Sequence, residues 1–307
     1  MTNVALIFPG QGTQAAGMGK NFYDSSDEAK QIFDDADAIL KNGLTDVVFN
    51  GPAEKLTSTA YCQPAILTMS VAALKVFETS EKFKNISVRY TAGLSLGEYA
   101  ALVACGALSF ENTLRLVERR STFMEEATKL SRGKMAAIIG LDKEVIVKVC
   151  EETGAQVANF NSPQQIVITG HAEKVEAACQ KLSAAGAKSV VPLDVSGGFH
   201  SSLMKPAADK FVHELANVDI ASPRCPIISN INAQPTSDPA AIRGNLAKQI
   251  TGSVQWVDTI NFIAKQGVEN FIEIGPGKVL KGLLRRINPQ LKVYNIENPA
   301  DIDALPF

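Results

Sequence analysis

Residues 88–104 read VRYTAGLSLGEYAALVA, which predicts a strand, a sharp turn and a helix in succession. Val88–Ala92 has the composition of a strand, and Glu98–Ala104 has that of a helix. Between them, Gly93–Gly97 matches G-x-S-x-G, a pattern in which a tight strand-to-helix turn exposes a nucleophilic serine. The start of the helix also points N–H groups toward developing negative charge. The context therefore favours Ser95 as a nucleophile over an incidental serine in a glycine-rich turn.

Three further segments outside this stretch are apolar and end at Gly, Pro or Asn: Val4–Phe8, Pro226–Asn230 and Asn270–Ile274. Strands that are buried on both faces of a parallel sheet have this composition. The segments alternate with helical runs along the chain. We therefore expect an α/β fold with a mainly parallel sheet.

The middle of the chain predicts a different order of elements. Strand, helix, two strands around a turn, helix and strand are expected at Met135–Gly140, Glu144–Thr153, Gln156–Phe160, Gln165–Thr169, Ala172–Ala185 and Lys188–Leu193. This β-α-β-β-α-β order is the ferredoxin-like arrangement. We therefore expect a small subdomain at 130–196, inserted into a large subdomain formed by 1–129 and 197–307.

Composition excludes several classes of protein. The 307 residues are 46% apolar and 20% charged, and 30 basic against 32 acidic side chains give a net charge of −2. This balance argues against general nucleic-acid binding. The five cysteines are scattered without a C-x-x-C pair, which fits reduced thiols and gives no metal-ligand spacing. The first residues resemble a strand rather than a signal peptide, and we expect no membrane segment, so a cytoplasmic protein is predicted.

A serine nucleophile needs a base to take its proton. Of the three histidines, His171 and His213 have the settings of helix-cap and helix-surface residues. His200 lies instead in Ser-Gly-Gly-Phe-His-Ser, a glycine-shaped loop ahead of a helix, where it can face a cleft. Asp142 and Asp194 lie between Ser95 and His200 but have no distinctive context, so a backbone carbonyl could orient the histidine instead.

Arg120 lies on an apolar stripe of the helix predicted at Phe110–Lys129. Its same-face neighbours are all apolar: Leu116, Val117, Phe123, Met124 and Ala127. A buried guanidinium needs a partner, either an internal carboxylate or the carboxylate of a substrate. The stripe by itself favours the internal pair and leaves the substrate open.

The loop at residues 8–14, FPGQGTQ, loosely matches a dinucleotide-binding fingerprint through Gly10, Gly12 and Ala15. The match fails on context, because residues 32–37 look helical where an acidic residue should end a second strand. The spacing of a P-loop is also missing. The loop can instead bring donors of Gln11 to an oxyanion.

Eight segments in order along the chain resemble one family, the malonyl-CoA:acyl carrier protein transacylases, with the related acyltransferase domains of polyketide and fatty-acid synthases. They are FPGQGTQ at 8–14, TxxxQPAI at 59–66, GLSLGEYAAL at 93–102, ERRSTFM at 118–124, NFNSP at 159–163, GGFHSSLMKPA at 197–207, VQW at 254–256 and EIGPGKVL at 273–280. One departure is Leu94, where the family usually has histidine. Phe199 resembles the malonyl-type signature of synthase domains.

The resemblance implies a hydrolase-like α/β core with a ferredoxin-like subdomain. It also implies roles for particular residues: Ser95 as nucleophile, His200 as general base, Arg120 as partner of the malonyl carboxylate, the backbone N–H groups of Gln11 and Leu96 as oxyanion hole, and the backbone carbonyl of Gln255 as the group that orients the histidine. The implied reaction is an S-malonyltransferase ping-pong cycle, from malonyl-CoA to acyl carrier protein. The two thioesters are similar in energy, so we expect no cofactor and no metal, and we expect a monomer.

Three other functions remain open. A serine esterase or thioesterase shares the serine and the histidine but transfers the acyl group to water, and Arg120 argues against it. A non-catalytic carrier-binding domain would lack Ser95 or His200, and both are present. An acyltransferase of a polyketide assembly line has the same motifs as one that supplies fatty-acid synthesis.

Overall fold

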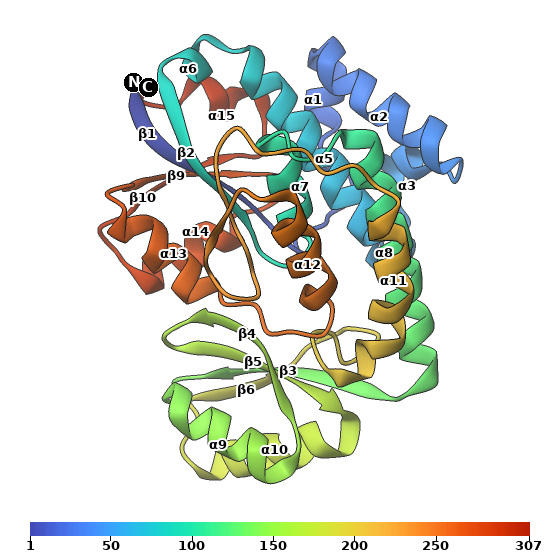
Figure 1. The fold of residues 1–307 in the computed structure, drawn as a ribbon, viewed down its shortest axis with the longest axis vertical. Helices are drawn as coiled ribbons and strands as arrows, with labels where there is room; N and C mark the ends of the chain where they lie inside the picture. The colour runs from blue at the N-terminus through green and yellow to red at the C-terminus, as the bar shows by residue number, and fades with distance from the viewer.

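The computed structural model describes residues 1–307 as a large lobe with a smaller lobe beneath it (Figure 1). The large lobe is built on a six-stranded sheet in the order β10-β9-β1-β2-β7-β8. Its strands are β1 Thr2–Phe8, β2 Ile86–Gly93, β7 Ile227–Ile228, β8 Pro235–Thr236, β9 Asn270–Ile274 and β10 Lys292–Ile296. All neighbours pair in parallel except β7 and β8. The predicted α/β fold with a mainly parallel sheet is confirmed, although β8 and β10 were not among the predicted strands.

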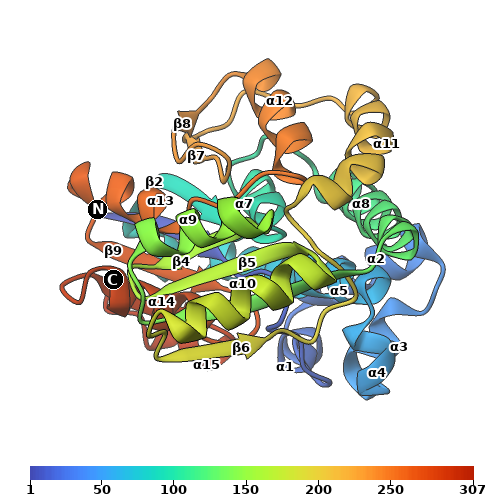
Figure 2. The same ribbon diagram turned by 90° about the horizontal axis from the view of Figure 1, so that it is seen from below.

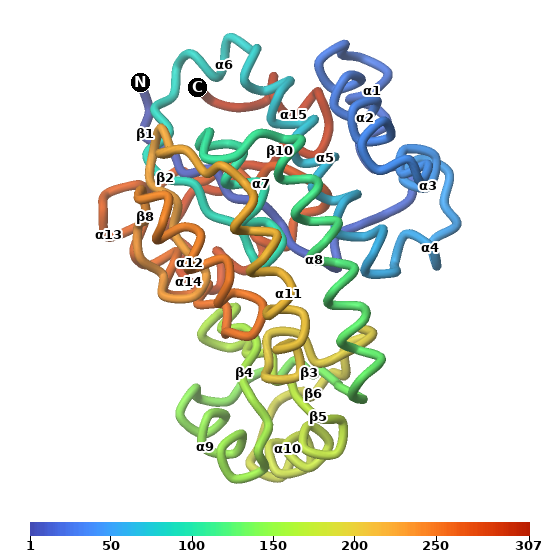
Figure 3. Tube along the Cα trace, turned by 45° about the vertical axis from the view of Figure 1, so that its right-hand side comes forward, coloured from blue at the N-terminus to red at the C-terminus, as the bar shows by residue number.

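Helices cover both faces of this sheet (Figures 1 and 3). They are α1 Lys20–Ser25, α2 Asp27–Leu40, α3 Leu44–Asn50, α4 Ala53–Thr57, α5 Thr59–Thr79, α6 Glu81–Lys84, α7 Gly97–Ala104, α8 Phe110–Leu130, α11 Lys205–Ala216, α12 Pro239–Gln249, α13 Trp256–Lys265, α14 Val279–Ile287 and α15 Pro299–Asp303, with a 3₁₀ turn at Ser202–Met204. Alternate residues of β1 enter separate cores: Leu6 packs in the larger cluster, and Ile7 packs with Trp256 on the opposite face. Both faces are thus buried, as the apolar strand predicts.

Helix α5 is the one helix that is long and apolar enough to cross a membrane by length and composition, a property that the sequence analysis did not anticipate. In the structure, 78% of its most apolar window is buried inside the protein. It packs against α8, α2 and α7 within the largest core cluster. Its hydropathy is therefore explained by its position as a core helix.

The smaller lobe has the predicted β-α-β-β-α-β order, with strands arranged β4-β5-β3-β6 in an antiparallel sheet (Figure 2). Its elements are β3 Gly133–Ile139, α9 Lys143–Thr153, β4 Gln156–Ser162, β5 Gln165–His171, α10 Ala172–Ala184 and β6 Ser189–Pro192. The exact domain limits at 130 and 196 stay a prediction. Ile138 packs with the cluster under α9 and α10, whereas Ala137 packs with the core of the large lobe. Successive side chains of β3 therefore point to opposite faces of its sheet, one packing within the small lobe and the next against the large lobe.

Two connections place the small lobe against the large one. Where the chain enters and leaves the small lobe, a Cβ on Gly133 would lie 2.2 Å from the backbone nitrogen of Gly198, so this crossing requires a glycine. On the other side, Phe160 N–H donates to the carbonyl of Val254 at 2.9 Å, and Val254 N–H donates to Ala158 at 2.8 Å. Strand β4 is thereby tied to the segment between α12 and α13.

Candidate active site

The turn between β2 and α7 is strained and closely packed. Ser95 has a φ of 53°, in the left-handed region that residues with a side chain rarely adopt. A Cβ on Gly93 would lie 1.9 Å from the carbonyl carbon of Gly97, and one on Gly97 would lie 2.1 Å from the carbonyl oxygen of Phe8. No side chain fits at either glycine. The two glycines of the G-x-S-x-G pattern therefore let the turn sit directly against β1.

The side chain of Asn230, two residues after the end of the neighbouring strand β7, holds this turn. Its Oδ1 accepts the N–H of Ser95 at 2.7 Å, and its Nδ2 donates to the carbonyl of Gly93 at 2.6 Å. Asn230 is 1% exposed. A single buried amide thus satisfies two backbone groups that the left-handed turn removes from regular pairing.

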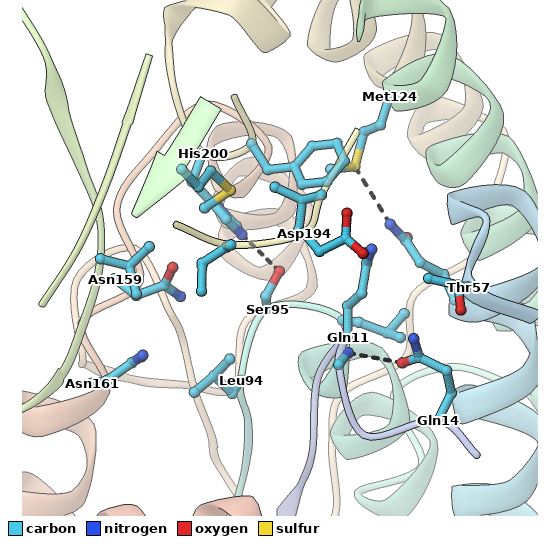
Figure 4. Close-up of a pocket in the computed structure, with 18 of the residues that line it drawn as sticks. Gln11, Gln14, Thr57, Leu94, Ser95, Met124, Asn159, Asn161, Asp194 and His200 are labelled. Atoms are coloured by element: carbon cyan, nitrogen blue, oxygen red, sulfur yellow. Dashed lines mark hydrogen bonds between the residues drawn. The ribbon is translucent and has the colours of Figure 1, made fainter. Parts of the chain in front are cut away.

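His200 lies against the nucleophile (Figure 4). Its Nε2 is 2.7 Å from Ser95 Oγ, and its Nδ1 is 2.9 Å from the carbonyl oxygen of Gln249 and 3.0 Å from that of Gly252. A carbonyl can only accept, so Nδ1 carries the proton and Nε2 is free to accept the serine proton. Burial, and after it the charge of Arg120, lowers the pKa of His200 to about 4. The imidazole is therefore neutral at pH 7.

The expectation that the carbonyl of Gln255 orients the histidine is wrong in this structure. Gln249 is the last residue of α12, and carbonyls in the last turn of a helix have no partner within the helix. The carbonyl of Gln249, with that of Gly252, faces Nδ1 of His200. Gln255 lies farther along the chain, where its carbonyl accepts the N–H of Thr259 at 2.9 Å at the start of α13. Neither Asp142 nor Asp194 bonds to the histidine.

Arg120 is 1% exposed, and its polar partners are all neutral. Nη1 donates to Gln63 Oε1 at 2.5 Å, and Nη2 donates to Gln249 Oε1 at 3.1 Å and Ser95 Oγ at 3.2 Å. Nε has no partner. No carboxylate oxygen lies within 4.0 Å of a guanidinium nitrogen of Arg120, so this arginine forms no salt bridge, unlike Arg115, Arg119 and Arg224. The internal ion pair that the apolar stripe favoured is absent. A buried cation without an anion beside it is suited to bind one.

Gln11 lies in the loop after β1, and Leu96 directly follows the nucleophile in the chain. Both residues line the same cavity as Ser95. Their backbone N–H groups donate to no group within the protein, and Leu96 directly precedes the first turn of α7. Free N–H groups at the start of a helix favour negative charge. Their role as an oxyanion hole stays a prediction.

The cavity that contains these groups has a volume of about 330 Å³ and lies between the two lobes (Figure 4). It brings together the predicted residues Ser95, His200, Arg120, Gln11 and Leu96. The remaining lining residues are Gly12, Gln14, Thr57, Gln63, Leu94, Met124, Met135, Asn159, Asn161, Val167, Leu193, Asp194, Val195 and Phe199. The small lobe thus supplies one wall, and Leu94 makes the wall beside the serine apolar.

Several residues of the site were missed by the sequence analysis. Gln63 lies in the segment TxxxQPAI and Glu98 in GLSLGEYAAL, but neither motif predicts a role for them. Gln249 and Asn230 belong to no catalytic motif. His171 and His213 are exposed, as their sequence settings suggest. No group of three or more His, Cys, Asp or Glu side chains is placed to hold a metal ion, and the five cysteines are unpaired.

Comparison with known proteins gives a consistent result over nearly the whole chain. Residues 5–295 match the family model described as "Acyl transferase domain". The malonyl CoA-acyl carrier protein transacylase of Bacillus subtilis is 46% identical, covering 99% of this chain and 96% of the relative. The solved acyl-carrier-protein-S-malonyltransferase of Bartonella henselae is 42% identical, with a TM-score of 0.95 over 99% of this chain and 98% of that one.

A further solved structure is a malonyl-transacylase in complex with a type II PKS acyl-carrier protein. It is 39% identical to this chain, with a TM-score of 0.94, and the match covers 99% of this chain and 98% of that one.

Proposed function

The chain belongs to the acyl transferase family, and we propose that it transfers the malonyl group of malonyl-CoA to the phosphopantetheine thiol of acyl carrier protein through a malonyl-Ser95 intermediate. One observation carries this proposal: a serine–histidine pair at 2.7 Å lies beside a buried arginine that has no acidic partner. The pair supports acyl transfer, and the arginine supports an acyl group that carries a carboxylate.

In the first half-reaction, Ser95 Oγ attacks the thioester carbonyl while Nε2 of His200 takes its proton. Because the pKa of His200 is lowered to about 4, the base is fully neutral at pH 7. The carbonyls at Nδ1 stabilise the imidazolium that forms, as a carboxylate does in a serine protease triad. The N–H groups of Gln11 and Leu96 bind the oxyanion, and CoA leaves as the thiol after it takes the proton from His200.

Arg120 selects the acyl group. Its planar fork binds the malonyl carboxylate through charge-assisted hydrogen bonds, which turns the nearby cation into one half of an ion pair. An acetyl group leaves the cation with its neutral partners only. A site built for a polar group rejects an analogue that lacks this group far more strongly than a hydrophobic pocket rejects a missing methylene.

In the second half-reaction, the phosphopantetheine thiol takes the place of CoA, and His200 removes its proton. The thiolate then takes the malonyl group from Ser95. One thioester is exchanged for another of similar energy, so the cycle needs no cofactor. The reaction is ping-pong, because CoA leaves before the carrier thiol enters.

Fatty-acid synthesis is the pathway that we propose for the product, in the cytoplasm of the cell. The five free cysteines, of which three are buried, are compatible with a reducing compartment. Supply of a polyketide assembly line is the second candidate, favoured by the relative that is complexed with a type II PKS acyl-carrier protein.

The test is intact mass after brief mixing with malonyl-CoA in the absence of carrier protein. We expect a malonyl adduct on the unmodified enzyme and none on Ser95→Ala. Addition of holo-acyl carrier protein should discharge the adduct onto the carrier thiol. Steady release of CoA with no adduct would instead indicate a hydrolase and overturn the proposal.

A further inference from the structure

Glu98 is a buried carboxyl behind the nucleophile that the reaction cycle leaves without a role. It is 3% exposed and follows Ser95 by three residues in the chain. Only one other acidic side chain, Glu273, is buried, and that one accepts the N–H groups of Leu280 and Lys281 at α14. Glu98 is therefore the only buried acid at the active site.

The side chain of Gln249 connects Glu98 to Arg120. Its Nε2 donates to Glu98 Oε2 at 2.6 Å and to the carbonyl of Ser95 at 3.0 Å, while its Oε1 accepts from Arg120 Nη2 at 3.1 Å. The Ser95 carbonyl can only accept, so the direction of the amide is fixed. Carboxylate and guanidinium are thus linked through one polarised amide, without a direct ion pair.

This arrangement makes Glu98 the internal counter-charge of Arg120. Burying a lone cation is costly, and a carboxylate one amide away reduces the cost. When a substrate carboxylate reaches Arg120, the buried cluster receives a second negative charge. Two carboxylates that share one cation disfavour each other's ionisation.

The inference that follows rests on the proposed function. We propose that Glu98 balances the charge of Arg120 in the unacylated enzyme and takes up one proton from solvent when the malonyl carboxylate binds to Arg120. One O–H bond forms on the Glu98 carboxylate, the proton comes from bulk water or buffer, and no other bond changes. The summed charge of Arg120, Glu98 and the acyl group is then zero both before and after binding.

The other titratable groups of the cluster keep their charge state near neutral pH. Burial raises the pKa of Tyr99, whose ring lies 5.4 Å from the Arg120 guanidinium carbon, and the pKa of His200 is lowered to about 4. Burial raises the pKa of Glu98 to about 7, while the bonds from Gln249 and Asn230 and the charge of Arg120 lower it in part. Glu98 is thus the group that can change its charge when substrate binds.

The direct test counts protons on Ser95→Ala, which binds substrate without reacting. Calorimetric titration with malonyl-CoA in two buffers of different ionisation enthalpy gives the number of protons taken up. The same titration with CoA gives the protons that binding of the CoA moiety itself takes up, and this number is subtracted. We expect about half a proton per site at pH 7 and nearly one at pH 8. Equal counts for malonyl-CoA and CoA at both pH values would overturn the inference.

The second test is the pH profile of single-turnover malonylation, read by intact mass. If Glu98 must be protonated, the rate constant at low malonyl-CoA falls about fivefold from pH 7 to pH 8. Glu98→Gln should abolish this slope, whereas a merely structural change would lower the rate equally at both pH values. A slope that is unchanged in Glu98→Gln refutes the inference. If Glu98→Gln does not fold, the proton count on Ser95→Ala decides the question.

The two proposals fail in distinguishable ways. Failure of malonyl-CoA to acylate the enzyme at any pH would refute the proposed function, and this inference with it. Malonylation of Ser95 without proton uptake would refute the role of Glu98 alone.

Discussion

Arg120 donates a hydrogen bond from Nη2 to Oγ of Ser95, at 3.2 Å. The cation that we assign to the substrate carboxylate therefore touches the nucleophile before substrate arrives. A substrate whose carboxylate binds this guanidinium is therefore held beside the attacking oxygen of Ser95. Selection of the acyl group and its positioning for attack are thus performed by the same side chain.

Arg120→Ala should lower the rate of acylation by malonyl-CoA about 100-fold or more, because two charge-assisted hydrogen bonds are lost. The rate with acetyl-CoA should change much less, so the preference between the two donors shifts toward acetyl. Arg120→Lys should restore only part of the preference, since a point charge lacks the fork. Adduct formation by intact mass, with each donor separately, measures both rates.

The matched control is Arg119→Ala on the same helix. The side chain of Arg119 is 52% exposed and lies 3.6 Å from Glu118, so its removal should leave both rates within about twofold. A parallel loss of malonyl and acetyl transfer in Arg120→Ala would contradict the carboxylate role.

The acid limb of the pH profile, where the acylation rate falls as the pH is lowered, should have its midpoint near pH 4. His200 acts as a base only when neutral, so activity is present above its pKa of about 4 and is lost as the pH falls through that value. The charge of Arg120 contributes to this lowering, so the limb should move to higher pH in Arg120→Ala. Single-turnover acylation after rapid pH jumps measures the limb. A limb at 6.5, the ordinary value for histidine, would contradict the prediction.

The sequence predicts local features of this site well, because the turn at Ser95 is encoded by adjacent residues. A strand, two glycines that cannot carry a side chain and a helix suffice to predict the turn. The βαββαβ order of the small lobe is encoded in the same local way, by patterns with periods of 2 and 3.6 residues. The two-residue strand β7 has too little of such a pattern to be delimited, and pairing with β2 defines it.

Gln249 could not be predicted, because its role depends on where α12 ends in space. Its backbone carbonyl meets His200 because the helix stops there, and its amide lies among Arg120, Glu98 and Ser95. None of these partners is close in sequence. The role of Gln255 is implied by the resemblance alone, and in the structure its carbonyl accepts the N–H of Thr259 at 2.9 Å.

Asn230→Ala should lower acylation by malonyl-CoA and acetyl-CoA alike, by about 10- to 100-fold, because two buried hydrogen bonds to the strained turn are lost. The preference between the donors should not change, in contrast to Arg120→Ala. Asn230→Asp should also be impaired, since it keeps the acceptor for Ser95 N–H but cannot donate to Gly93. Single-turnover rates with both donors are the measurement.

Asn232→Ala in the same loop is the control. Its side chain is exposed and only accepts the local N–H of Gln234, so it should retain normal rates. Normal rates in Asn230→Ala would show that Ser95 keeps its left-handed conformation without this amide, contrary to the prediction.

Gly97→Ala should destabilise the fold, whereas Gly282→Ala should stabilise it. The added methyl at Gly97 would lie 2.1 Å from the carbonyl oxygen of Phe8 and 2.8 Å from that of Pro9, so β1 and the turn must move apart, at a cost of about 3 kcal/mol or more. At Gly282, within α14, the methyl would meet nothing within 4 Å, and alanine is favoured over glycine in a helix by about 1 kcal/mol. Urea unfolding should therefore give the lowest midpoint concentration for Gly97→Ala, an intermediate one for the unmodified chain and the highest for Gly282→Ala. An unchanged midpoint in Gly97→Ala would mean that β1 and α7 can separate without cost, and the close packing assigned to the turn would be wrong.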